Sequence, residues 1–533
     1  MIRDNRSYAR VLLSLLAGLA ASACGPERAA GPVVEPGEPR PGHGRKVEGV
    51  HPGLEIAAIR PPGMSLGVGG LSVLPDGRLV VATFDAQQVL PLDPSTELNG
   101  ELWVVDNVDA DDLSGIVALQ LADDLQEPLG VATVGADIYV SHRDEVTRFA
   151  FDDTSTNWTR TTVAGGWESR DWHSFAFGLL HEPGEAGHPG YLYMSRSTGL
   201  GRFSNPPDHG AVWRIDLGRP AGDNVEPLIG GLRTPNGLGF GPEGEVFVTD
   251  NQGEWTPANE LNHVQKGHFY GFEHAIEGPD DHPTPYQDPA DRQSPGQEAT
   301  LPAIQLPQDE IANSPTQPIL IPDGQPYAGQ MLVGDMRYGG IQRLQLERVN
   351  GVWQGAAFRY SMGLEAGVNR LAWGPDGALY AGGIGGDHAG SWAWVNDEGE
   401  RTFAGLQRLR PTGVLAFEMR SVRVTPEGFE LEFTQSVPWA YLAQPGNYHL
   451  QQWGYRRTPA YGGVKLGQQE LPVTQAIPSD DRMSVRLTVP GRETGRVVYI
   501  MTDPVSDTGE HLWTTESWYT LHQIPEEVLD EDG

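Results

Sequence analysis

The stretch RTPNGLGFGPEGEVFVTDNQGEW, residues 233–255, decides the fold. It alternates a turn, a short apolar strand, a second turn and a second strand. Proline presets φ for a turn and glycine accepts the positive φ that closes it, so the pattern predicts a β-hairpin. The hairpin ends on Asp250-Asn251-Gln252-Gly253, which is too polar to be only a strand terminus. We therefore expect both a hairpin and a candidate site at its polar end.

The same phrase recurs along the chain. Close copies are GLSVLPDGRLVVATFD at 70–85 and VNRLAWGPDGALYAGGIG at 368–385. Looser copies lie at 128–143, 175–196 and 318–337, and a further strand such as ELWVVD (101–106) follows most of them. These six units are spaced roughly 45 to 80 residues apart, which is near the range of propeller blades. They predict a six-bladed β-propeller over residues 50–412, with five or seven blades as alternatives.

The turn phrase stops after Pro411, and strands without it follow. Segments such as FELEFTQSV and RMSVRLTVP predict an Ig-like antiparallel β-sandwich of about seven strands over residues 413–522. Trp453, Tyr455 and Tyr461 lie in an aromatic, glycine-rich loop, which is either a docking face or simple packing. The acidic tail, 523–533, is expected to be frayed and without a role.

Composition agrees with an all-β protein of more than one domain. The chain has 533 residues with 68 Gly and 43 Pro, which favours many short strands joined by tight turns. The net charge of −34 makes nucleic acid a poor partner, because phosphate binding needs clustered Lys and Arg. An acidic surface repels anions and can collect cations such as Ca²⁺.

The N-terminus predicts export. Three arginines, an apolar run at 11–20 and small residues precede Cys24, the single cysteine. Cys24 resembles the lipidated cysteine of a bacterial lipoprotein, so we expect a signal peptide at 1–24 and a Pro/Gly-rich tether at 25–49. Gly25 after Cys24 resembles the pattern that sorts lipoproteins to the outer membrane of the bacterial cell envelope. The protein would then contact the membrane only through its N-terminal lipid. A plain signal peptide is the alternative.

The hairpin and the segments after it resemble the glucose/sorbosone dehydrogenase family. These are soluble pyrroloquinoline quinone (PQQ) sugar dehydrogenases on six-bladed propellers, and the chain is most similar to secreted relatives with a C-terminal β-sandwich. The resemblance covers roughly two thirds of the chain. Its matching segments are Arg233-Thr-Pro-Asn236-Gly-Leu238, Asp250–Gly253, Asn259-Glu-Leu-Asn262 and Gly267–Phe272.

The resemblance implies a site. His173 would be the general base that takes a proton from a sugar hydroxyl, a task that suits neutral imidazole. Arg233 and Asn236 would bind PQQ, with further cationic contacts from Arg337 and Arg370. Gln252 and Gly253 would hold Ca²⁺. The resemblance implies that these residues together form the candidate site.

Two segments depart from the family pattern. The family's His-x-Gly-Gly is His173-Ser-Phe-Ala here, and the bulk of Phe175 could fill space that a cofactor needs. The family's Glu-His-Gly-Pro is Asp250-Asn-Gln-Gly, which alters the proposed metal turn. His173 could also be a structural histidine, and Arg233 could cap backbone carbonyls.

Three functions are therefore open. The first is a surface-anchored quinoprotein dehydrogenase that oxidises a sugar or polyol with PQQ and Ca²⁺ and passes electrons to a separate acceptor. The second is a non-catalytic propeller lipoprotein that binds carbohydrate or a protein partner, and the third is a calcium-dependent lactonase-type hydrolase. The redox function requires His173, Arg233 and Gln252 to point into one cavity. It fails if His173 and Arg233 lie on opposite rims, or if aromatic side chains occupy the place of a flat tricyclic ligand.

Overall fold

A computed structural model describes residues 39–45, 47, 49–85, 98–151, 158–167, 169, 173–185, 187–198, 209–272, 299–337, 340–385, 394–395 and 401–526. The predicted lipidation site Cys24, the signal peptide and most of the tether lie outside these residues, as does the end of the acidic tail. No helix in this described part is long and apolar enough to cross a membrane.

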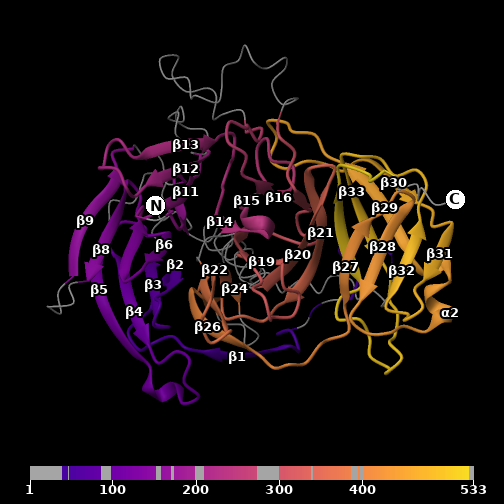
Figure 1. The fold of residues 1–533 in the computed structure, drawn as a ribbon, viewed down its shortest axis with the longest axis horizontal. Coiled ribbons are helices and arrows are strands. Elements are labelled where there is room, and N and C mark those ends of the chain that lie inside the picture. The colour runs from indigo at the N-terminus through magenta and orange to yellow at the C-terminus, as the bar shows by residue number, and fades with distance from the viewer. Residues whose placement is uncertain are drawn as a thin grey trace, which may run out of the picture.

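The first three blades are four-stranded antiparallel sheets (Figure 1). Blade one contains β2 (Gly67–Val73), β3 (Leu79–Phe84), β4 (Gly100–Asp106) and β5 (Val117–Leu125). Blade two contains β6 (Gly130–Val134), β7 (Asp137–Ser141), β8 (Glu145–Phe151) and β9 (Trp158–Gly165). Blade three contains β10 (Ala176–Glu182), β11 (Tyr191–Arg196), β12 (Ala211–Asp216) and β13 (Val225–Ile229).

Three further blades complete the ring. Blade four contains β14 (Gly237–Phe240), β15 (Val246–Asp250), β16 (Asn259–His263) and β17 (Ile304–Leu306). Blade five contains β18 (Pro315–Leu320), β19 (Met331–Asp335), β20 (Gly340–Val349) and β21 (Val352–Ser361). Blade six contains β22 (Gly367–Trp373), β23 (Leu379–Ile384) and β26 (Ala404–Pro411), beside the short pair β24 (Trp394–Val395) and β25 (Arg401–Thr402). The early strand β1 (Leu54–Ala58) pairs with β26 and closes the ring, so the six-bladed prediction is confirmed.

The Pro-Asp-Gly phrase forms the predicted turns. In blade one, Gly77 has φ +93° and its N–H donates to the Leu74 carbonyl at 2.9 Å. Asp76 Oδ1 accepts the N–H of Arg78 at 3.2 Å. Blade six repeats the arrangement, with Gly377 at φ +78° and Asp376 accepting the N–H of Ala378 at 3.2 Å. The recurring sequence therefore closes equivalent hairpins in different blades.

The C-terminal sandwich has eight strands where the sequence predicted about seven. One sheet contains β27 (Met419–Val424), β28 (Gly428–Phe433), β32 (Ser484–Thr488) and β31 (Gln475–Pro478). The other contains β34 (Glu516–Leu521), β33 (Arg496–Met501), β29 (His449–Gly454) and β30 (Leu466–Leu471). A core that includes Phe429, Leu431, Val485 and Ile500 fills the space between them, and the one-turn helix α2 (Trp439–Leu442) lies at the edge.

The propeller and the sandwich share a sheet. The outer strand of blade five, β21, pairs with β34 of the sandwich, with Ala356 opposite Tyr519, so one sheet has eight strands. The orange and yellow strands of the sandwich stand beside β21 in Figure 1. A common apolar core contains Phe247 of blade four, Met331 of blade five and Trp518 of the sandwich. The two parts therefore form one continuous packed unit.

Candidate functional site

The polar end of blade four is built around a buried carboxylate. Asp250 ends β15, and its oxygens accept the backbone N–H of Arg233 at 2.8 Å and that of Thr234 at 2.6 Å. In blade five, Asp335 at the end of β19 accepts the backbone N–H of Asn313 at 2.6 Å, so the same kind of hydrogen bond occurs in two blades. Burial raises the pKa of Asp250 to about 7, and the facing Glu260 adds to the rise while the two N–H donors oppose it. The carboxylate thus fixes the turn that carries Arg233.

His173 meets that turn through a threonine hydroxyl. Its Nδ1 lies 2.6 Å from the Thr198 carbonyl oxygen, which fixes the proton on Nδ1. Nε2 is then an acceptor, 3.3 Å from Thr234 Oγ1, and that hydroxyl oxygen accepts from Arg233 Nη1 at 3.1 Å. Burial, with the charges of Arg233 and Arg143, lowers the pKa of His173 to about 3. The imidazole is therefore neutral and a permanent hydrogen-bond acceptor.

Arg233 lies flat against Gly253. A Cβ at position 253 would be 1.8 Å from Arg233 Nε, so a side chain there would displace the guanidinium. Arg233 Nε donates to Glu254 Oε2 at 2.9 Å, and its Cζ lies 5.2 Å from the centre of the Tyr461 ring. We name His173, Arg233, Thr234, Asp250 and Glu254 the blade-four site. It brings together His173 and Arg233 as the sequence predicts, with Gly253 beneath the guanidinium.

The predicted metal ligands are bonded within the protein. The Gln252 N–H donates to Asn259 Oδ1 and its Nε2 donates to the Pro257 carbonyl, both at 3.0 Å. The Gly253 carbonyl accepts the N–H of Gly462 from the sandwich at 2.9 Å. In the described part of the chain, no cluster of three or more His, Cys, Asp or Glu could hold a metal ion.

Arg370 and Asn236 lie apart from the blade-four site, on the propeller axis. Arg370 Nη1 donates to the main-chain and side-chain oxygens of Asn236 at 3.0 and 3.1 Å, and Nη2 donates to the Leu129 carbonyl at 2.6 Å. These acceptors belong to blades four and two, and Arg370 to blade six, so the guanidinium lies where alternate blades meet. Asn369 continues the network to the Val68 carbonyl of blade one at 2.8 Å. Burial lowers the pKa of Arg370 to about 9.

Buried apolar side chains pack together beside Arg370, whose Cζ lies 6.0 Å from the centre of the Phe177 ring. They come from five blades, at the end where inner strands begin and second strands finish. We name them the axial cluster: Phe84, Leu129, Phe175, Phe177, Met336 and Ile384. The rings of Phe175 and Phe177 are 5.2 Å apart, and the His173 ring is 5.6 Å from that of Phe175.

These contacts test the fit to PQQ and Ca²⁺. His173 and Arg233 share one rim, as required, but the Gln252 side chain does not join them and donates to the Pro257 carbonyl. Both Nη atoms of Arg370 are bonded to Asn236 and to the backbone, and only its buried Nε lacks a partner among the described residues. The buried side chains of the axial cluster pack beside them. The Gly253 carbonyl is bonded to the sandwich. The described residues therefore do not fit the cofactor and the metal.

Arg337, the remaining predicted cofactor contact, is exposed after β19, and its N–H donates to Asp335 at 3.0 Å.

The sequence interpretation missed the contribution of the sandwich. Residues 455–465, between β29 and β30, form what we name the sandwich loop, and they lie on blade four. Trp453 and Tyr455 pack in the shared core, whereas Tyr461 is exposed over Arg233. The aromatic, glycine-rich composition was the available signal, but nothing in it indicates which blade the loop contacts.

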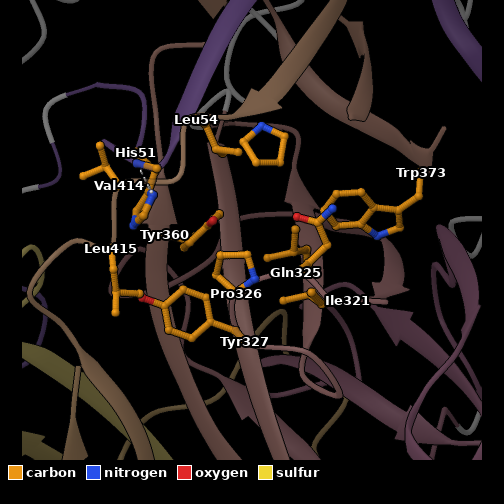
Figure 2. A pocket seen from close by; sticks show the side chains of 13 residues that line it. His51, Leu54, Ile321, Gln325, Pro326, Tyr327, Tyr360, Trp373, Val414 and Leu415 are labelled. Atoms are coloured by element: carbon orange, nitrogen blue, oxygen red, sulfur yellow. Dashed lines mark hydrogen bonds between the residues drawn. The ribbon is translucent and has the colours of Figure 1, made fainter. Parts of the chain in front are cut away.

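A separate hollow lies where blades five and six meet the link to the sandwich (Figure 2). The His51 ring stacks on Tyr360 with centroids 4.3 Å apart, and His51 Nε2 is 3.1 Å from Glu418 Oε2. The Tyr327 hydroxyl donates to the same oxygen of Glu418. Burial opposes ionisation of Glu418, but the His51 hydrogen bond and the Arg343 charge hold its pKa below the usual value. These bonds join the propeller to the sandwich, and the described residues lining the hollow include none from the blade-four site.

The known proteins found to be similar to this chain are solved structures. No protein family matches the chain. No curated protein matches it either. A crystal structure described as a putative glucose dehydrogenase from Thermus thermophilus is 19% identical, covering 67% of this chain and 100% of that chain with a TM-score of 0.46.

Two further solved structures are similar over about the same share. The PQQ-bound aldose sugar dehydrogenase of Streptomyces coelicolor is 16% identical, covering 68% of this chain and 100% of that chain with a TM-score of 0.42. The PQQ domain of pyranose dehydrogenase from Coprinopsis cinerea is 13% identical, covering 68% and 96% with a TM-score of 0.44. At these values the likeness carries no argument about activity. The fold is established by the strand order: an all-β, six-bladed propeller joined to a β-sandwich.

Proposed function

We propose that this chain is a propeller lipoprotein that binds a carbohydrate or polyol at the blade-four site. The observation that carries the proposal is the meeting of His173, Thr234 and Arg233 from two separate segments, joined by contacts of 3.3 and 3.1 Å. Binding at the bacterial cell surface through a lipidated Cys24 is part of the same proposal and rests on the sequence.

The chemistry of the three groups suits a neutral hydroxyl-rich ligand. A vicinal diol offers both donors and acceptors, and it needs both from the protein. Arg233 carries N–H donors, and His173 Nε2 and the Glu254 carboxylate are acceptors; without a ligand they bond to Thr234 and to one another, and a diol would exchange for these bonds. With a pKa of about 3, His173 is a weak proton acceptor at pH 7, so hydrogen bonding suits it better than general-base catalysis.

Isothermal titration calorimetry tests the proposal with monosaccharides, disaccharides and acyclic polyols. Arg233→Met and Thr234→Val should weaken binding by about tenfold or more, which is about 1.4 kcal/mol. Arg214→Met is the matched control, because Arg214 also lies over a tyrosine, with its Cζ 4.5 Å from the Tyr191 ring centre, and pairs with Glu226 at 2.7 Å. Its substitution should leave binding unchanged. Absence of binding to every compound would refute the proposal.

A quinoprotein dehydrogenase is the second candidate, because His173 and Arg233 do lie on one rim. The bonds of Arg370 and Asn236 and the packing of the axial cluster count against it, so it requires these side chains to rearrange before PQQ can bind. Purified protein mixed with PQQ and Ca²⁺ would then show a shifted quinone absorbance and reduce a dye with aldoses. His173→Ala should abolish that turnover and retain PQQ binding.

A further inference from the structure

The sandwich loop adds a strand-like edge to blade four. The Trp255 N–H donates to the Thr458 carbonyl at 2.8 Å, and the Gly462 N–H donates to the Gly253 carbonyl at 2.9 Å. Between them Glu254 and Tyr461 form an antiparallel bridge. A third bond, from the Gly463 N–H to the Pro257 carbonyl, is 2.8 Å. Backbone bonds therefore fix this loop against the polar end of the hairpin.

Two ion pairs fix the loop at its ends. Arg457 Nη2 lies 2.9 and 3.1 Å from the two oxygens of Glu260, and the side chains are only 9% and 1% exposed. At the other end, Lys465 pairs with Glu310 and lies 3.6 Å from the centre of the Trp453 ring. A loop held by one buried ion pair, one partly exposed ion pair and backbone bonds is preorganised, which reduces the ordering cost of binding.

This fixed loop exposes apolar surface beside a charged pair. Tyr461 is 64% exposed and Val464 is 76% exposed. The guanidinium of Arg233 lies over one face of the Tyr461 ring and donates to the carboxylate of Glu254. Single exposed apolar side chains are common, so what marks a site here is the fixed position of this ring beside polar groups. Here the loop holds an aromatic ring in a fixed place next to a hydrogen-bond donor and an acceptor.

We infer that the sandwich loop forms one wall of the ligand site, with the Tyr461 ring as the platform for one face of a pyranose. The inference rests on the proposed function and narrows its substrate class from carbohydrates and polyols to ring sugars. A pyranose has an apolar C–H face for the aromatic ring and hydroxyls around its edge for Glu254 and Arg233. An acyclic polyol has no rigid face to stack. The role of the sandwich is thus to complete the binding site of the propeller.

The test compares methyl glucopyranoside, methyl galactopyranoside and sorbitol by calorimetry on the full chain. Tyr461→Ala should weaken pyranoside binding about tenfold and sorbitol binding less than twofold, whereas Tyr461→Phe should stay within twofold of wild type. Trp439→Ala is the control, since Trp439 is an aromatic of the sandwich that is 51% exposed on α2. It should bind like wild type.

Two results would overturn the inference in different ways. If wild type binds pyranosides and Tyr461→Ala loses less than twofold, or loses sorbitol equally, then the stacking role is wrong and the proposed function stands. If wild type binds none of the three compounds, then the proposed function fails together with the inference. Binding of a protein partner through Tyr461, without sugar binding, belongs to this second result.

Discussion

Replacing Arg457 with methionine tests whether the sandwich neutralises a charge inside the propeller. Arg457 pairs with Glu260, and Glu260 lies directly opposite Asp250 across β15 and β16. Methionine keeps the length of the side chain and removes the charge, so the Glu260 carboxylate loses its cation. Breaking a buried pair by removing one partner costs about 3–5 kcal/mol, because the remaining charge has no compensation.

The pH dependence of the loss can be worked from the same pair. Burial already raises the pKa of Glu260 from 4.5, and Arg457 opposes that rise. Without Arg457 the effect of burial is unopposed, so we expect the pKa of Glu260 to rise further and the cost of folding this carboxyl group to grow as pH rises above 4.5. When folding raises the pKa of a carboxyl group, the folded protein becomes less stable as pH rises above the pKa of the unfolded state. The free energy of unfolding of the variant should therefore be much closer to that of wild type at pH 5 than at pH 7. Asp250 titrates in both the variant and the wild-type protein, so the difference between their free energies of unfolding removes most of the Asp250 contribution.

Urea unfolding followed by tryptophan fluorescence measures these free energies. The double variant Arg457→Met/Glu260→Gln removes both charges and should recover most of the stability lost at pH 7. Arg214→Met, which breaks an exposed pair, should cost about 0–1 kcal/mol. If Arg457→Met and the double variant are equally unstable, or if the loss is the same at pH 5 and pH 7, the unpaired-charge argument is refuted and lost packing is the cause.

Three other changes test the remaining geometry. Gly253→Ala should lower the free energy of unfolding by about 1–3 kcal/mol and weaken sugar binding, because a Cβ there would be 1.8 Å from Arg233 Nε. Gly115→Ala is the control, because a Cβ at position 115 would meet nothing within 4 Å. Equal sugar binding by the two variants would contradict the placement of Arg233. Arg370→Met should lower the free energy of unfolding, measured in urea, by about 1–3 kcal/mol, since it leaves buried oxygens of Asn236 and Leu129 without their donor. A loss under about 1 kcal/mol would count against Arg370 as a link between blades. Micromolar PQQ with Ca²⁺ should leave the thermal unfolding midpoint unchanged, and a rise of several degrees would favour the dehydrogenase instead.

Local chemistry predicted the blades well. Pro-Asp-Gly closes a hairpin through bonds within a few residues, so Asp76 and Gly377 could be interpreted from the sequence alone. The closing strand β1 and the pairing of β21 with β34 could not, because their partners are far along the chain and no local pattern specifies them.

The candidate site was predictable in residue type and less so in role. His173 and Arg233 lie on one rim and are joined through Thr234, as the family resemblance implied that they would be close. Arg370 was expected at a cofactor, but the structure shows it bound to Asn236 and Leu129, since a sequence shows a cation and not the acceptors around it. Gly253 was expected to offer a carbonyl to a metal. Its missing side chain is what matters, as it leaves room for Arg233.

The pairing of β21 with β34 also bears on how the protein is made. Synthesis proceeds from the N-terminus, so β34 (Glu516–Leu521) leaves the ribosome long after the blades. Until then the outer strand of blade five has an unpaired edge, and the apolar side chains around Trp353 lack Trp518 and Tyr499. The nascent propeller must wait for the last strand before that edge is covered. A shortened chain that stops near residue 412 would keep the edge open and would be prone to aggregate, even though all six blades are encoded in it.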